Sequence, residues 1–272
     1  MKRLIITADD FGLCREVNEA VVQAHTEGIL TCASLMMGEE VTNEAIGLAK
    51  ANPTLKTGLH LTLVEGRSVL PHEKIPGLAD KEGRFSNAIV WSGIRYFFSR
   101  ALQKQIEAEC RAQIEKFLAS GLKMDHLNSH NHLHIHPSIL KIVIELAKEY
   151  KIPAIRLPFE RAYVNRYNML VAPWVLRCRR ALNKADICHN DFTFGLSETG
   201  KMTLQTWENI FPKLDGGVTE VYCHPAVQTA GVLQETMPDY QHAEELEALT
   251  HPRLKELVKK YGVQRISFGD IS

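Results

Sequence analysis

Short apolar runs alternate along this chain with longer segments in which apolar residues recur at helical spacing. The runs predict strands at residues 4–7, 33–37, 57–63, 154–157, 220–223 and 264–268. The periodic segments predict helices at residues 14–27, 43–51, 107–120, 137–150, 240–250 and 252–261. Strands that are apolar throughout and alternate with helices are typical of parallel sheets covered on both faces. The pattern therefore predicts an α/β fold with mostly parallel strands in a barrel-like sheet.

Two segments interrupt this alternation. Residues 71–87 are rich in glycine, proline and charge, which predicts a long excursion. The second segment, at about residues 158–200, is a basic, aromatic-rich insert that carries Tyr163, Tyr167 and Trp174. Such an insert suits an anionic membrane surface or a cover over a lipid-bearing ligand. The pattern favours the alternative of a solvated helix whose apolar stripe packs on the barrel, and both interpretations are kept.

Length, charge and cysteine content limit the number of domains and the kinds of partner that this chain can have. The 272 residues, 45% of them apolar, show no linker, so we expect a single domain over residues 1–272. The 32 basic and 32 acidic side chains cancel, which argues against nucleic-acid binding. The six cysteines contain no Cys-x-x-Cys pair and predict reduced thiols. The apolar run before Asp9 is too short for a signal peptide, so we expect a cytoplasmic location.

Two adjacent carboxylates, Asp9 and Asp10, follow the first apolar run. This is the carboxyl end of a predicted parallel strand, where α/β folds place their active sites. Successive strand residues point in opposite directions, so we expect one carboxylate to hold a cation and the other to move protons. Alternatively, Asp10 could cap the helix that begins near Cys14.

Five of the twelve histidines fall between residues 126 and 136, all at even positions. In extended backbone His130, His132 and His134 would share a face, whereas a turn at residues 128–131 would scatter them. So dense a cluster beside a strand end favours a metal or proton-transfer site.

Two further histidines lie at other predicted strand ends. His60 interrupts an apolar run, where burial requires a hydrogen bond or a metal, and His224 precedes Pro225. Asp10, His60 and one histidine of the cluster would form a two-histidine, one-carboxylate metal site. Asp9 could then take a proton and His224 could give one to a leaving amine. This layout predicts an amide or ester hydrolase.

Four motifs occur in order along nearly the whole chain: TADDFGL from residue 7, GLHLTL from 58, HLNSHNHLH from 126 and VYCHPA from 221. Together they resemble the YdjC-like carbohydrate deacetylases, which are similar in turn to the NodB-type polysaccharide deacetylases. The resemblance implies a distorted (β/α) barrel of the NodB/YdjC type. It also implies a metal-dependent hydrolase that removes an N-acetyl group from an N-acetylglucosamine-type sugar.

The same resemblance implies roles for eight residues and a cofactor. The residues are Asp9 as general base, His224 as general acid, Asp10, His60 and His130 as metal ligands, and Arg156, His134 and Asn128 as substrate-binding residues. Arg156 also resembles the family's arginine near the catalytic aspartate. The implied cofactor is one divalent metal ion, magnesium by the resemblance. The ligand types would suit zinc, manganese, cobalt or iron as well.

One departure indicates a subgroup: Asn128 stands where chitooligosaccharide deacetylases of the family usually have aspartate. With the aromatic insert, it resembles the hopanoid-biosynthesis-associated (HpnK-like) branch, which implies an N-acetylglucosaminyl hopanoid as substrate. Trp91, Tyr96, Phe97, Phe98 and residues 163–176 could line a membrane-adjacent approach for such a glycolipid, at the inner membrane surface.

Other interpretations stay open at this point. The chain could be a chitooligosaccharide deacetylase, an O-acetyl esterase or a non-catalytic lipid-sugar binding module. A homodimer is the default expectation for a barrel of this class.

Overall fold

The computed structural model describes residues 1–160 and 166–271. Within these residues seven strands form one sheet in which every pairing is parallel. The strands are β1 (Lys2–Phe11), β2 (Cys32–Leu35), β3 (Lys56–Leu61), β4 (Met124–Ser129), β5 (Phe192–Phe194), β6 (Gly217–Cys223) and β7 (Val263–Arg265). They lie in the order β4-β3-β2-β1-β6-β5, with β7 paired to β1. The predicted fold class is confirmed.

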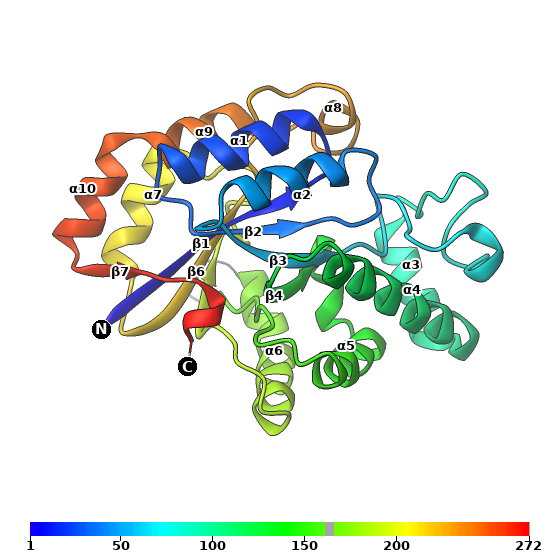
Figure 1. Ribbon diagram of the computed structural model, residues 1–272. Coiled ribbons are helices and arrows are strands. Elements are labelled where there is room, and N and C mark those ends of the chain that lie inside the picture. The colour runs from blue at the N-terminus through cyan, green and yellow to red at the C-terminus, as the bar shows by residue number, and fades with distance from the viewer. Residues whose placement is uncertain (161–165, 272) are drawn as a thin grey trace.

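Helices surround the outside of this sheet (Figure 1). They are α1 (Arg15–Thr26), α2 (Thr42–Ala51), α3 (Ile89–Phe98), α4 (Arg100–Ala119), α5 (Pro137–Glu149), α6 (Arg166–Lys184), α7 (Leu204–Ile210), α8 (Val232–Thr236), α9 (His242–Thr250) and α10 (Pro252–Lys260). None of those in the described residues has the length and apolar character needed to cross a membrane.

Strand β1 forms the centre of the sheet. It pairs with β6 along most of its length, with β7 at its start and with β2 at its end. Leu4, Ile5, Ile6 and Ala8 are completely buried, as the apolar run predicted for a strand covered on both faces. The two aspartates at its end are therefore presented by the most enclosed strand of the molecule.

Residues 154–159 close the gap between the two ends of the sheet. The predicted strand at 154–157 is wrong, because this segment makes only isolated parallel bridges, Leu127 with Ile155 and Ala154 with Cys188. Pro153 and Pro158 flank the segment, and prolines cannot donate to a strand ladder. The result is a distorted barrel that is closed by an irregular segment instead of a strand, and Arg156 belongs to this segment.

Several element boundaries differ from the prediction. Helix α3 was not predicted, and α4 begins at Arg100 because Ser99 caps it, accepting a hydrogen bond from the Leu102 amide at 3.3 Å. The predicted last strand ends at Arg265, and Phe268 lies in a 3₁₀ turn. The alternative role of Asp10 as a helix cap is also wrong, because α1 follows Cys14 as its N-cap and no side chain caps it.

The basic insert is partly described. Tyr163 lies outside the described residues, and the side chain of Tyr167 is not described. Farther along α6, Val175, Cys178 and Leu182 are buried in the main core, so this part of the insert packs an apolar stripe on the barrel. Membrane contact by the insert stays a prediction.

Candidate active site

A pocket of about 370 Å³ opens where the carboxyl ends of β1, β3, β4 and β6 meet. It is lined by Asp9, His60, Glu65, Ile89, Ser129, His130, Asn131, His132, Leu196, Thr199, Tyr222, His224, Thr236, Met237 and Tyr240. Parallel strands end at one edge of a barrel, which is why side chains far apart in sequence converge here. The expected convergence of Asp9, His60, His130 and His224 is what the structure has.

The backbone at Asp10 brings both carboxylates to the same site. Asp10 has a φ of 63°, and the register of β1 with β2 shifts between Ala8 and Phe11. The expectation that the two aspartates point to opposite faces is therefore wrong, because a left-handed residue breaks the strand alternation. Asp9 Oδ1 lies 3.9 Å from His60 Nδ1, and Asp10 Oδ1 lies 3.2 Å from His60 Nε2. A single imidazole thus has a carboxylate near each nitrogen.

The histidine cluster turns rather than running straight. After β4 the chain enters a 3₁₀ segment (His130–Ile135) in which Asn131 and His132 have left-handed φ angles of 53°. The turn directs His130 Nδ1 to Asp10 Oδ1 at 2.9 Å and His132 Nε2 to the Tyr222 hydroxyl at 3.3 Å. The extended arrangement is wrong, and the scattering alternative is confirmed.

Asp10, His60 and His130 form a potential metal-binding group. One donor atom from each lies within 4.8 Å of the others, and Asp10 and His60 are buried. The second oxygen of Asp10, Oδ2, is buried and has no hydrogen-bond partner in the described part of the chain. A buried carboxylate oxygen without a donor is costly, and a cation would satisfy it.

The donor and acceptor roles of the two His60 nitrogens also indicate a cation site. The Nδ1 atom lies 2.7 Å from Asn128 Oδ1, an acceptor, so Nδ1 carries the proton and donates it. His60 Nε2 is then an acceptor that faces another acceptor, Asp10 Oδ1, at 3.2 Å. A metal ion bound by both atoms, or a second proton on the imidazole, would remove the repulsion between these two lone pairs. These donors fit a divalent metal ion.

The raised pKa of His130 also indicates a site that attracts positive charge. Burial would lower this pKa, but the carboxylates of Asp10 and Glu65 outweigh it and raise the pKa to about 10. Without a metal ion the imidazole is therefore held as a cation between two carboxylates. A bound divalent ion would supply that positive charge in place of the proton.

Asp9 is held by an arginine at the floor of the pocket. The Arg156 guanidinium donates to Asp9 Oδ2 at 2.5 Å and to Oδ1 at 3.0 Å, and its other face donates to Glu220. Burial would raise the pKa of Asp9, but Arg156 and His60 bring it far below its ordinary value. Asp9 is thus a fixed carboxylate that can only accept hydrogen bonds.

The position of His224 is set through its backbone. Its amide donates to Glu245 Oε2 at 2.5 Å, and His242 Nδ1 donates to its carbonyl at 2.6 Å. Burial lowers the pKa of His224 to about 4, against the opposing effect of Asp10 and Asp9. Its Nδ1 is buried without a partner among the described residues. This imidazole is neutral near pH 7, so it must gain a proton before it can donate one.

The three predicted substrate-binding residues do not line the pocket. Arg156, His134 and Asn128 are completely buried, and each is satisfied by other protein groups. His134 Nε2 donates to the Arg156 carbonyl at 3.0 Å, so its Nδ1 accepts from Ser129 Oγ at 2.8 Å. These side chains lie behind the residues that line the pocket, and their contact with substrate stays a prediction.

Three residues at the site were missed by sequence reasoning. Glu65, the first charged residue after β3, lies 3.6 Å from His130 Nε2 and accepts from Asn131 Nδ2 at 2.7 Å. Tyr222 lines the pocket from within the VYCHPA motif, and Glu220 is the buried partner of Arg156. The sequence could have indicated Glu220, since a charged residue inside a buried apolar strand needs a partner of opposite charge.

Comparisons with known proteins agree with this arrangement. The sequence model of the family described as "YdjC-like protein" matches residues 3–260. A carbohydrate deacetylase from Brevibacillus brevis is 35% identical over 99% of both chains. One from Vibrio parahaemolyticus is 31% identical over 96% of this chain and 93% of its own.

Solved structures support the fold as well. The crystal structure of a proposed cellobiose-phosphate cleavage protein from Enterococcus faecalis matches with a TM-score of 0.77 and 26% identity, covering 100% of this chain and 99% of that one. The lactam utilization protein from Thermus thermophilus matches at a TM-score of 0.53 and 14% identity, over 97% and 98% of the two chains, and shows the fold alone.

Proposed function

The chain belongs to the YdjC-like family, and on that premise we propose that it is a metal-dependent carbohydrate N-deacetylase. Its relatives from Brevibacillus brevis, Vibrio parahaemolyticus and Clostridium beijerinckii are carbohydrate deacetylases. The observation that carries the proposal is the pairing of two carboxylates around one imidazole. Asp10 forms a potential metal site with His60 and His130. Asp9 lies beside this site and accepts hydrogen bonds from Arg156.

The metal would be held by Asp10, His60 and His130, and when bound it would supply a Lewis acid that acidifies water and polarises the acetamide carbonyl. Magnesium follows from the family, while zinc, manganese and cobalt suit the imidazoles better. Asp9 takes the proton from the attacking water at its carboxylate. Arg156 keeps Asp9 ionised and oriented, so the acceptor is in place before the substrate arrives.

His224 is the proposed acid for the departing amine. It lines the same pocket as Asp9, from the end of β6. Because its pKa is about 4, the imidazole begins the cycle neutral and must gain a proton during turnover, the equivalent of the one that Asp9 takes from the attacking water. It then passes that proton to the nitrogen of the sugar as the bond to the acetyl carbon breaks, which gives acetate and a free amine.

The substrate we propose is an N-acetylglucosamine unit on a glycosylated hopanoid, as in the HpnK-like branch. A second pocket, of about 410 Å³, shares Asn131, His132 and Leu196 with the first. Its other lining residues are mostly apolar, and they are Leu133, Ile135, His136, Pro137, Pro158, Val171, Trp174, Val175 and Ser197. A polar pocket that continues into an apolar one suits a sugar with a lipid aglycone.

Helix α3 extends this apolar region to the surface. Its first residue, Ile89, lines the polar pocket, while Trp91 and Phe98 are 60% and 79% exposed. Phe97 packs against His136, which lines the apolar pocket. We propose that α3 lies against the lipid part of the substrate or the inner membrane surface that carries it.

The decisive experiment measures acetate release by the metal-reconstituted protein from N-acetylglucosaminyl hopanoid and from diacetylchitobiose, with O-acetylated sugars as a third substrate. Release from the hopanoid alone supports the whole proposal. Release from chitobiose alone leaves a chitooligosaccharide deacetylase, and release from the ester alone leaves an esterase. No acetate release from any of the three substrates would favour a lipid-sugar binding module. The unit assayed is the whole chain, which we propose folds as one domain.

A further inference from the structure

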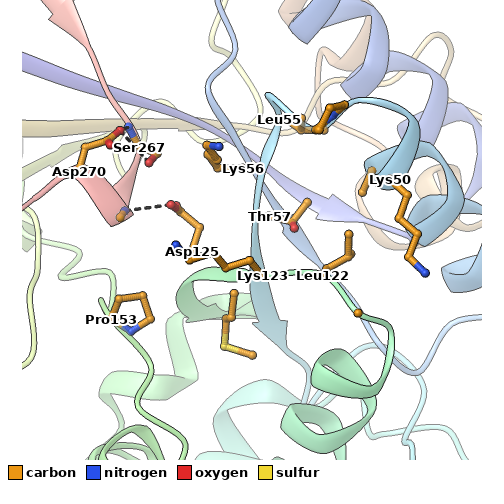
Figure 2. Close-up of a pocket in the computed structure, with 15 residues that line it drawn as sticks. Lys50, Leu55, Lys56, Thr57, Leu122, Lys123, Asp125, Pro153, Ser267 and Asp270 are labelled. Atoms are coloured by element: carbon orange, nitrogen blue, oxygen red, sulfur yellow. Dashed lines mark hydrogen bonds between the residues drawn. The ribbon is translucent and has the colours of Figure 1, made fainter.

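A third pocket lies at the opposite end of the strands from the proposed metal site. It has a volume of about 400 Å³ and is bounded by the first residues of β3 and β4 and by the chain after β7 (Figure 2). Asp125 forms part of its wall and is nearly buried. Its two oxygens accept hydrogen bonds from the backbone amides of Phe268 at 3.2 Å and Gly269 at 2.9 Å. This carboxylate is therefore fixed as an acceptor.

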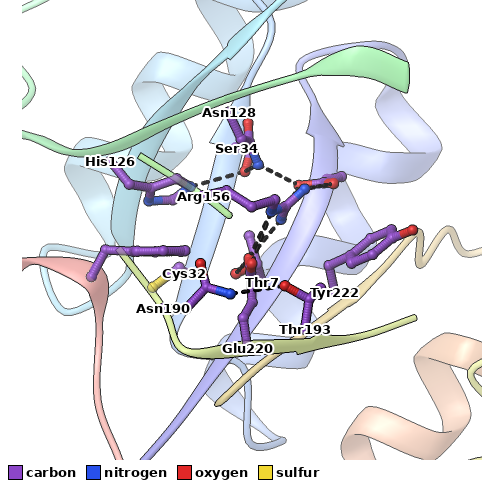
Figure 3. A network of polar contacts seen from close by, with 12 residues as sticks. Thr7, Cys32, Ser34, His126, Asn128, Arg156, Asn190, Thr193, Glu220 and Tyr222 are labelled. Carbon is purple, nitrogen blue, oxygen red and sulfur yellow. Dashed lines mark hydrogen bonds and ion pairs between the residues drawn. The ribbon is translucent and has the colours of Figure 1, made fainter. Parts of the chain in front are cut away.

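A continuous chain of hydrogen bonds leads from Asp125 toward the pocket that contains Asp9. Figure 3 shows its middle members, His126, Ser34 and Asn128. Asp125 Oδ2 lies 3.1 Å from His126 Nδ1, and His126 Nε2 lies 3.0 Å from Ser34 Oγ. Ser34 Oγ in turn accepts from Asn128 Nδ2 at 2.8 Å. All of these side chains except Asp125 are completely buried.

The direction of every hydrogen bond in the chain is determined. Asp125 accepts, so His126 Nδ1 donates and its Nε2 accepts from the Ser34 hydroxyl. With its own proton used in this way, Ser34 Oγ accepts from the amide of Asn128. The amide nitrogen of Asn128 also donates to Asp9 Oδ1 at 3.1 Å. Its oxygen is thus left for His60 Nδ1.

We propose that Asp125 positions the metal ligand His60 through His126, Ser34 and Asn128. The chain holds the Asn128 amide in one orientation, and that orientation selects the His60 tautomer whose Nε2 is free for a metal ion. Asn128 is held from both sides, by Ser34 and by Asp9. Asp125, His126 and Ser34 are positioning residues, since none of them lines the pocket with Asp9.

An aspartate at position 128 would act differently. It could accept from His60 Nδ1 but would present a second oxygen to Asp9 and would lack the amide protons that reach Ser34 and Asp9. The directed chain therefore depends on the asparagine that this sequence has.

The inference rests on the metal site of the proposed function, and its test uses binding rather than turnover. Ser34→Ala and Asp125→Ala cut the chain at two separate links. Ser92→Ala removes a serine that is equally buried but lies in α3, outside the chain, and serves as the matched control. Zinc affinity is measured by calorimetry, and the His60 Nδ1–H proton is followed by NMR in the metal-free protein.

We expect both cuts to weaken zinc binding about tenfold and to shift or broaden the His60 Nδ1–H resonance, with no change in Ser92→Ala. Unchanged affinity and an unchanged resonance in both cut variants would overturn the inference. A parallel loss of affinity in Ser92→Ala would also overturn it, because the effect would then be general destabilisation. Failure of the wild type to release acetate would count against the proposed function alone.

Discussion

Arg156 and Asp9 form a bidentate ion pair at the floor of the pocket, with contacts of 2.5 and 3.0 Å and almost no solvent exposure on either side chain. Two charges buried in this way are costly unless their hydrogen bonds are complete. Glu220 supplies the remaining partner of the guanidinium. The pair explains how a carboxylate can be held ionised and immobile beside a site for a cation.

Asp9→Asn should abolish catalysis while leaving metal binding intact. Loss of the proton acceptor is expected to lower acetate release by about 10²- to 10⁴-fold. Zinc should still bind, because Asp9 is not among the potential ligands Asp10, His60 and His130. Its affinity should fall by no more than about tenfold, the loss expected when one of the two hydrogen bonds that hold Asn128 is disturbed. Asp191→Asn makes the same chemical change at a carboxylate that bonds the Val218 amide outside the pocket. Loss of zinc binding in Asp9→Asn would make Asp9 a ligand instead of the base.

Removing the Asp9 charge should also change how stability depends on pH. The folded pKa of Asp9 lies far below its ordinary 3.8, so the carboxylate contributes stability above about pH 3.8 that is lost as the pH falls toward the folded pKa. The difference in unfolding free energy between wild type and Asp9→Asn should therefore be constant near neutrality and shrink in acid. Urea unfolding of the metal-free proteins at a series of pH values measures it. A difference that grows in acid would contradict the depressed pKa.

Chelation should separate a catalytic metal from a structural one. We expect acetate release to disappear when the metal is removed and to return on addition of the correct ion. The melting temperature should fall only by the amount that ligand linkage gives, because the barrel core does not include the site. Adding magnesium, zinc, manganese and cobalt separately identifies the ion. Unfolding on chelation would instead support a metal that only holds the histidine segment in place.

The sequence was sufficient to predict which strand ends meet. Apolar runs located β1 and β6, and parallel topology then required Asp9 and His224 to lie at one edge. It was insufficient for the left-handed Asp10 and the turn at Asn131 and His132, because their positive φ angles are imposed by tertiary contacts and occur at residues other than glycine.

Supporting residues were the hardest to assign from sequence. The family resemblance placed Arg156 near the catalytic aspartate, where it lies, but sequence alone does not distinguish a buried arginine from one that lines a pocket, so Arg156 was also assigned to the substrate. Its actual partners, Asp9 and Glu220, are far away along the chain and are brought together only by the barrel. Helix α3 was missed although its apolar residues are distributed unevenly around the helix, as in an amphipathic helix.

The exposed face of α3 gives a prediction that separates the two substrate classes. Trp91→Ser with Phe98→Ser removes two large apolar side chains that are 60% and 79% exposed, so unfolding free energy should stay within about 0.5 kcal/mol. If α3 contacts lipid, acetate release from the glycolipid in vesicles should fall about tenfold or more, since burial of such side chains stabilises binding by about 1.5–3 kcal/mol each. Release from diacetylchitobiose should not change.

Leu118→Ser provides the matched control, because Leu118 is 41% exposed and lies on α4, outside both pockets. It should leave both activities at the wild-type level. Equal loss on both substrates in the α3 variant would mean that α3 supports the pocket itself through Ile89, and would remove the argument for a lipid aglycone. Loss on the glycolipid only when it is embedded in vesicles, and not when it is dispersed in detergent, would assign α3 to the membrane surface in preference to the aglycone.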